Sequence, residues 1–234
     1  MSEFRLSFPA SFIAGKVRLS AEDVSILRRV SFPDGIRSSD DAVLLLAIQN
    51  SCPEKCDEWS AFFIEALTSF IVHQTHPHGS LDDNNAAWLI RILSRGGVIH
   101  SAMELEVLLS VIDASASVPP TLSAFALDQL RHALSDGIGA YRSLRAMDRQ
   151  GITRHDLEFV HHVLRKAALA GDRALSQIEV NTLDCIDQAV QAGVNHPGWA
   201  ELRKAVKRRQ DEAGRNARWL RVSDDMLTGT NAAA

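Results

Sequence analysis

Three histidines in one short segment, His73, His76 and His78, are the residues of this 234-residue chain best suited to chemistry. Two cysteines, Cys52 and Cys56, precede them. Thiolate and imidazole groups are the usual protein ligands of zinc, so the pattern predicts a metal-binding sensor or a metal-dependent enzyme that uses the histidine loop. A polar, histidine-rich loop that binds no metal is the alternative interpretation of the same residues.

The spacing of these residues limits which of them can share one metal. The segment between the cysteines and the histidines, residues 59–72, is largely apolar and typical of a buried helix. At ~1.5 Å of rise per residue, this helix would hold the two groups roughly 20 Å apart. We therefore expect the histidines to act without the cysteines. The loop does not fit calcium, because an EF-hand with Gly79 at its sixth position would place Gln74 and two histidines where oxygen ligands are required.

A run of basic residues near the C-terminus is the second chemical feature. Between positions 203 and 221 the chain has eight basic residues against Asp211 and Glu212, a local charge of +6, with Trp199 and Trp219 on either side. A basic helix of this kind predicts contact with a protein partner, an anionic membrane surface or nucleic acid. A solvated terminal helix, or one that pairs with the acidic remainder of the chain, is the alternative. The basic residues are Arg203, Lys204, Lys207, Arg208, Arg209, Arg215, Arg218 and Arg221.

Other polar clusters predict no catalytic residue and no cofactor. His155, His161 and His162 have no serine or cysteine nucleophile placed beside them by the sequence. Three carboxylates on one expected helix, at 179, 184 and 187, are more typical of a solvated acidic stripe than of an acid and base pair. The paired glycines near 96 and 138 lack the strand that a nucleotide-binding loop requires, so we interpret them as turns.

Composition indicates an ordinary globular chain. Hydrophobic residues make up 46%, aromatic residues 6%, and the net charge is −4, so there is no global attraction to nucleic acid or anionic lipid. Three cysteines argue against a disulfide framework. The first 21 residues carry no unbroken apolar run of the kind found in secretory signals. We therefore expect a cytoplasmic protein.

Helical periodicity and capping signals predict an all-α fold. Near residue 20, for example, Val24, Leu27 and Val30 are spaced to share one helix face. No segment alternates for long enough to predict a strand. The glycines around 137 mark the best candidate for a boundary between two subdomains. The expected organisation is an irregular arm over 1–18, a helical domain over 19–134, a connecting segment over 135–150, a second helical half over 151–222 and a disordered tail over 223–234.

The two helical halves share a pattern of helix starts, which predicts duplicated helix pairs. In each half a hydroxyl residue is followed three places later by an acid, and a second such start and a tryptophan come after it. A weaker third copy runs from Asp83 to Ser101. Recurrent capping in any helical protein is the alternative explanation. The matched positions are Ser20 and Asp23 with Thr153 and Asp156, Ser38, Asp41, Ala42, Leu45 and Ile48 with Ser176, Glu179, Val180, Leu183 and Ile186, and Trp59 and Phe62 with Trp199 and Leu202.

The helix starts at 35–41 and 97–104 each contain a glycine, a small apolar residue, a serine and an acid three places after it. Together with the Ala- and Leu-rich composition, they resemble the tellurite-resistance TerB-like family of bacterial helical proteins. The segment 59–66 is similar to one in uncharacterised proteins grouped near that family. The resemblance covers about residues 19–111 and, more faintly, 151–208. It implies a compact bundle of helix pairs, a cytoplasmic role in stress response or near the envelope, and no established catalysis.

Taken together, the residues favour a non-enzymatic, cytoplasmic interaction protein that docks through its basic C-terminal helix. A metal sensor or metal-dependent enzyme using the histidine loop is the second hypothesis. A nucleic-acid-binding regulator is the third, and it depends on the same basic helix.

Overall fold

The computed structural model describes residues 15–145, 151–169, 175–190 and 194–218, and these ranges form helices joined by turns. Besides the helices, the described ranges contain two isolated β-bridges and no strand. The predicted all-α fold is confirmed. The elements are α2 (Ala21–Ile26), η1 (Leu27–Ser31), α3 (Ser39–Ser51), α4 (Asp57–Ser69), η2 (Phe70–Gln74), α5 (Asp83–Leu93), α6 (Ala102–Ala114), α7 (Pro120–Ser135), α8 (Ala140–Ser143), α9 (Arg154–Leu169), α10 (Gln177–Ala189) and α11 (Pro197–Arg218).

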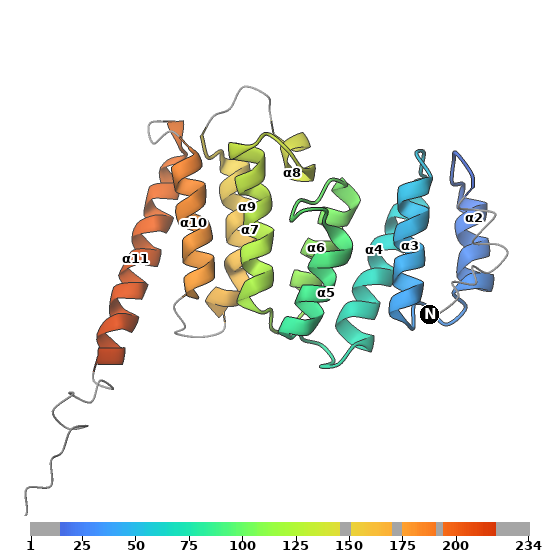
Figure 1. Cartoon of the computed structure of the whole chain (residues 1–234), viewed down its shortest axis with the longest axis horizontal. Coiled ribbons are helices and arrows are strands. Elements are labelled where there is room, and N and C mark those ends of the chain that lie inside the picture. The colour runs from blue at the N-terminus through green and yellow to red at the C-terminus, as the bar shows by residue number, and fades with distance from the viewer. Residues whose placement is uncertain (1–14, 146–150, 170–174, 191–193, 219–234) are drawn as a thin grey trace, which may run out of the picture.

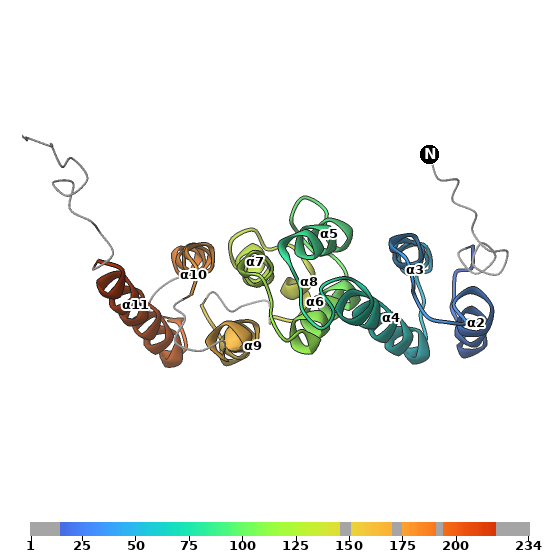
Figure 2. The same ribbon diagram turned by 90° about the horizontal axis from the view of Figure 1, so that it is seen from below.

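The helices form an elongated array of two layers, with α2 at one end and α11 at the other (Figure 1). Seen along the helices, α3, α5, α7 and α10 make one layer, and α2, α4, α6, α9 and α11 make the other (Figure 2). Successive long helices therefore alternate between layers. Within the layers, α2 packs on α4, α4 on α6, α5 on α7 and α7 on α10. In this arrangement α5 and α6 occupy the layers opposite to those of α2 and α3, so the weaker third copy is not placed like the first.

Helix starts follow the capping pattern expected from the sequence. The side chains of Ser20, Ser38 and Ser176 each accept a hydrogen bond from the backbone N–H three residues on, and the acid at that position accepts one from the cap in return. Thr153 and Asp156 make the same reciprocal bonds before α9. These bonds satisfy N–H groups that have no partner inside the helix. Ser101 differs, because no side chain caps α6.

One continuous apolar core runs through both halves, from Leu19 before α2 to Val206 in α11. The segment predicted to connect the halves contains α8, whose Tyr141 is fully buried and donates a hydrogen bond to Asp156 of α9 at 3.1 Å. Residues 135–145 therefore help to pack the halves together rather than separating them. Residues 1–14 of the expected arm and the whole expected tail lie outside the described residues.

Two π-helical turns end the helices at the N-terminal end of the array. The first, η1, follows α2, and the second, η2, follows α4. A π-turn has more residues per turn than an α-helix, so it rotates later side chains away from the expected face. Val24 and Leu27 are buried as predicted, but Val30 is 58% exposed, and the prediction for that residue was wrong for this reason.

No helix within the described ranges combines the length and the apolar character needed to cross a lipid bilayer.

Candidate functional site

The three histidines of the predicted metal site are all exposed and lie at the end of η2 and in the loop after it. The rings of His76 and His78 are neighbours, with centroids 6.0 Å apart. Within the described ranges, no group of three or more His, Cys, Asp or Glu side chains gathers to hold a metal ion. Cys52 is buried at the C-terminal end of α3. The geometry therefore gives the metal hypothesis no support.

The predicted basic stretch forms most of α11. Arg203 is half-buried and pairs with Asp184 of α10, and Arg208 lies 3.9 Å from Glu212 on its own helix. The side chains of Lys204, Lys207 and Arg209 are exposed. Arg215 and Arg218 belong to the last turns of α11, and Arg221 lies outside the described residues.

A buried tryptophan fixes α11 on α10. Trp199 is 2% exposed, and its indole Nε1 donates a hydrogen bond to Asp187 Oδ1 at 2.7 Å. Val206 is buried two turns later on the same face. Two of the three carboxylates interpreted as a solvated stripe, Asp184 and Asp187, thus hold α11 in place. The sequence did not reveal these contacts, because they depend on how α10 and α11 pack on each other.

The surface of this helix pair is hollowed into a groove of about 500 Å³. Its apolar part comes from Val180 and Val206, and Lys204 and Lys207 stand at its basic side. Asp184 is already paired with Arg203, so the two lysines are left to receive acidic groups from outside. The complete lining is Val180, Asp184, Asp187, Arg203, Lys204, Val206, Lys207 and Gln210.

The corresponding surface of α4 shows why this groove is open. In α4, Trp59 Nε1 donates to Gln49 Oε1 of α3 at 2.8 Å, which matches the bond from Trp199 to α10. The positions four, five, eight and eleven residues after the tryptophan are apolar in α4 and pack under the helices that come next. In α11 the same positions are polar or basic. The two sets are Phe63, Ile64 and Leu67 in α4 with Phe70 at the start of η2, and Arg203, Lys204, Lys207 and Gln210 in α11.

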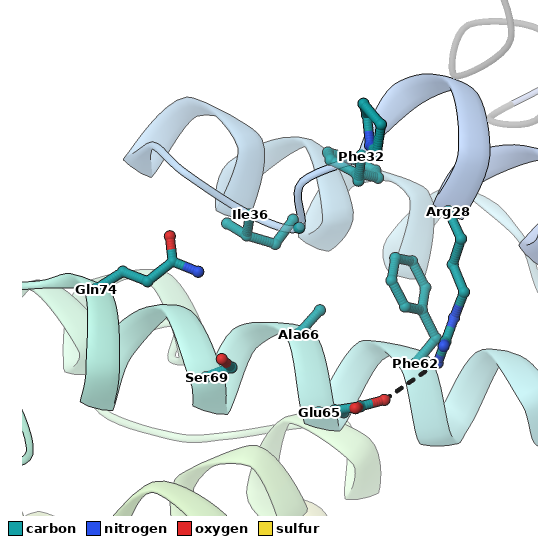
Figure 3. Close-up of a pocket in the computed structure, with 10 residues that line it drawn as sticks. Arg28, Phe32, Ile36, Phe62, Glu65, Ala66, Ser69 and Gln74 are labelled. Carbon is teal, nitrogen blue, oxygen red and sulfur yellow. Dashed lines mark hydrogen bonds and ion pairs between the residues drawn. The ribbon is translucent and has the colours of Figure 1, made fainter.

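A second groove, of about 290 Å³, lies at the opposite end of the molecule between η1 and α4 (Figure 3). Its floor is apolar, with Phe32, Phe62 and Ala66. Arg28 crosses one end, where it pairs with Glu65 at 3.1 Å and stacks over the Phe62 ring at 4.9 Å from the centroid. This groove was not predicted from the sequence, because the π-turn that aims Arg28 at α4 has no clear sequence signal. The two charged residues that line this groove, Arg28 and Glu65, pair with each other.

A buried polar cluster joins α8 to α9 and plays a structural part. Arg145 and Asp156 pair at 3.0 Å with side chains 4% and 0% exposed, and Arg145 also donates to the Gly151 carbonyl at 2.7 Å. Burial raises the pKa of Tyr141, and the neighbouring Asp156 charge adds to the shift. The tyrosine therefore stays protonated and donates to Asp156. A cluster closed to solvent in this way has no room for a substrate.

Comparison of the chain with models of protein families, with curated proteins and with solved structures found no match. Function must therefore be inferred from the grooves and charges of the molecule itself.

Proposed function

We propose that the protein is a non-enzymatic, cytoplasmic docking protein that binds an acidic amphipathic helix of a protein partner in the groove between α10 and α11. The observation that carries this proposal is the groove of about 500 Å³ in which Lys204 and Lys207 flank an apolar surface. In α4 the corresponding positions are covered by the next helices of the chain. A helix from a partner can take that place on α11, with its acids opposite the lysines.

The surroundings of the groove favour a protein over other polyanions. The apolar surface at this site lies inside a concave groove between two helices, which suits an inserted helix better than the flat surface of a membrane. The groove carries two exposed basic side chains, Lys204 and Lys207, beside an apolar surface, which suits an amphipathic helix better than a nucleic-acid backbone, whose binding depends on many phosphate contacts. The TerB-like resemblance adds a setting in stress response or near the envelope.

A binding assay with a designed probe tests the proposal. The probe is a fluorescent helical peptide of leucine and glutamate in an amphipathic pattern, and its anisotropy is followed at low salt. The double variant Lys204→Glu with Lys207→Glu should weaken binding by about tenfold or more, because two attractive charges become repulsive. The matched control, Arg29→Glu with Arg37→Glu, makes the same charge change at the exposed far end and should change binding less than about twofold.

Three results would contradict this function. Unchanged binding in the lysine variant would exclude the groove, and equal weakening in the control would show only a general charge effect. Tighter binding of the wild-type protein to a 20-base-pair DNA duplex or to vesicles containing phosphatidylserine would exclude an acidic protein helix as the preferred partner. Thermal unfolding of each variant checks that the fold is intact.

A further inference from the structure

A polar cleft of about 410 Å³ lies in the middle of the array, away from both grooves. It is bounded by the C-terminal ends of α3 and α5, the turn after α5, and the N-terminal end of α6. No function was assigned to any of its residues from the sequence. They are Asn50, Arg91, Ile92, Leu93, Ser94, Arg95, Val98, His100, Ser101 and Glu104.

The turn that forms one wall of the cleft is held firmly. Gly96 and Gly97 have φ values of +61° and +84°, which only glycine adopts at little cost, and they close a bridge between Arg95 and Val98. Gln129 of α7, which is 2% exposed, accepts a hydrogen bond from the Ile99 N–H at 2.8 Å and donates to the Gly97 carbonyl at 3.0 Å. A buried amide thus fixes the backbone that carries Arg95 and His100.

Two arginines and a histidine converge on this cleft from three positions. Arg91 comes from the last turn of α5, Arg95 from the turn, and His100 from the residue before the α6 cap. All three are exposed, and neither Arg91 nor His100 forms an ion pair with another described residue. Guanidinium groups present several N–H donors in a plane and are well suited to phosphate and carboxylate oxygens. The cleft therefore has unused capacity to bind an anion.

The floor of the cleft adds hydrogen-bonding groups of a different kind. Glu104 is 7% exposed; its carboxylate accepts the Ser101 backbone N–H and interacts with Asn50. The Ser101 hydroxyl oxygen accepts a hydrogen bond from Gln49 Nε2 at 3.4 Å, and it does not cap any backbone N–H of α6. The positive end of the α6 dipole consequently adds to the field of the arginines. Carboxylate and amide groups beside a cationic site are typical partners for hydroxyl groups of a ligand.

We infer that this cleft binds a small phosphate monoester that carries hydroxyl groups, with the phosphate at Arg91, Arg95 and His100 and the hydroxyls at Asn50 and Glu104. Seven of its ten lining residues are polar or charged, which favours a polar ligand over an apolar one. Its volume is in the range of small-molecule sites. This site is independent of the docking groove on α11.

The charge of Glu104 makes binding depend on pH. Burial raises the pKa of Glu104, although the Ser101 N–H, Arg95 and Asn50 act in the opposite direction. The groups that face it across the cleft are Arg91, Arg95 and His100. An ionised Glu104 repels a phosphate, whereas a protonated one can donate to it. Affinity should therefore rise as the pH falls through the raised pKa of Glu104.

Isothermal titration calorimetry of the full chain with glucose 6-phosphate, inorganic phosphate and glucose tests the inference. We expect glucose 6-phosphate to bind more tightly than phosphate, and glucose to give no detectable binding. The variant Arg91→Gln with Arg95→Gln should weaken phosphate-ester binding by at least about tenfold. The control Arg29→Gln with Arg37→Gln removes two exposed arginines elsewhere and should leave binding unchanged.

A third variant separates a ligand site from a structural role. Glu104→Gln keeps the hydrogen bond from Ser101 but removes the negative charge, so it should tighten binding of glucose 6-phosphate at pH 8 and reduce the dependence on pH. The inference is overturned if neither phosphate compound binds, if Arg91→Gln with Arg95→Gln binds as the wild type does, or if Glu104→Gln leaves the dependence of binding on pH unchanged. None of these variants changes Lys204 or Lys207, so failure here leaves the docking proposal standing.

Discussion

The two ends of the array, α2 to α4 and α9 to α11, share the same local contacts but differ in the surface that their third helix presents. Each begins with a capped helix whose buried acid pairs with a basic residue from the preceding segment, Lys16 with Asp23 at one end and Arg145 with Asp156 at the other. Each then places a tryptophan indole against the middle helix of the three.

The difference lies in the residues after the tryptophan. Beyond Trp59 the chain continues with apolar side chains that the next helices cover, whereas Trp199 is succeeded by arginine and lysine at the corresponding positions. A terminal element of a helical array needs a polar outer face to remain monomeric. The basic face of α11 suits the position of this helix as the last one that the structure describes, and the groove with Lys204 and Lys207 is the part of that face for which we propose a partner. Duplication of the two ends stays a prediction.

Replacing the tryptophans should produce the largest effects. Trp59→Ala empties an interior site and leaves Gln49 without its partner, so we expect the free energy of unfolding to fall by about 4 kcal/mol. Trp199→Ala should instead release α11 and leave the remaining helices folded. Urea denaturation measures the first effect, and amide hydrogen exchange resolved by segment measures the second. If both variants lose the same free energy of global unfolding, then α11 is as much a part of the cooperative fold as α4, which contradicts the prediction.

Replacing the buried acid before α9 should come next. Asp156→Asn leaves the Arg145 guanidinium buried without a countercharge, which should cost about 3 kcal/mol in chemical denaturation. The corresponding change at the other end, Asp23→Asn, should cost only about 1 kcal/mol, because the Lys16 side chain is 35% exposed and can return to water. If Asp156→Asn and Asp23→Asn lose similar free energies of unfolding, then the deeper burial of the Arg145 and Asp156 pair does not make it more important for stability.

Restoring the apolar pattern of α4 on α11 should produce self-association. Lys204→Ile with Lys207→Leu places an exposed apolar surface at the end of the array, and its burial between two copies contributes about 2 kcal/mol. Sedimentation velocity should show a sedimentation coefficient that rises with protein concentration. Arg208→Leu with Arg209→Leu, on the same helix but outside the groove, should associate less. A monomeric groove variant would contradict the view that the lysines keep this end solvated.

The smallest expected effect is the dependence of stability on Asp23 ionisation. Burial acts to raise the pKa of Asp23, but hydrogen bonds from Lys16 and Ser20 outweigh it, and the pKa lies below its ordinary value of 3.8. Its contribution is therefore complete at pH values above 3.8 and is lost as the pH falls through the lowered pKa. Thermal unfolding between pH 6 and 2.5 should lose less stability in Asp23→Asn than in the wild type. Identical pH profiles would show that the carboxylate makes no such contribution.

Contacts between residues close in sequence were predicted well, and contacts between residues far apart in sequence were not. The caps at Ser38 and Ser176 depend on residues three places apart, and the start of α11 at Pro197 agrees with the general preference for proline in the first turn. The contact between Tyr141 and Asp156 depends on the path of the chain between them.

The candidate sites divide in the same way. The basic face of α11 was visible because its residues are contiguous, but its groove depends on acids of α10. The central cleft joins Asn50, Arg91 and Glu104 from three helices, and it is shaped by Gln129 from a fourth. No local pattern connects these positions. Periodicity also gave the wrong face for Val30, because π-turns change the number of residues per turn.

The alternation of successive helices between two layers also bears on how the protein is made. Several helices pack on elements close to them in sequence, as α2 does on α4 and α4 on α6, although α7 and α10 join across α8 and α9. Chains with such local contacts fold quickly. As the polypeptide leaves the ribosome, α2 to α4 can complete their shared core before the later helices are synthesised. The apolar surface after Trp59 would then be exposed only until α5 and α6 emerge, whereas α11 presents polar and basic side chains at the corresponding positions as soon as it is made.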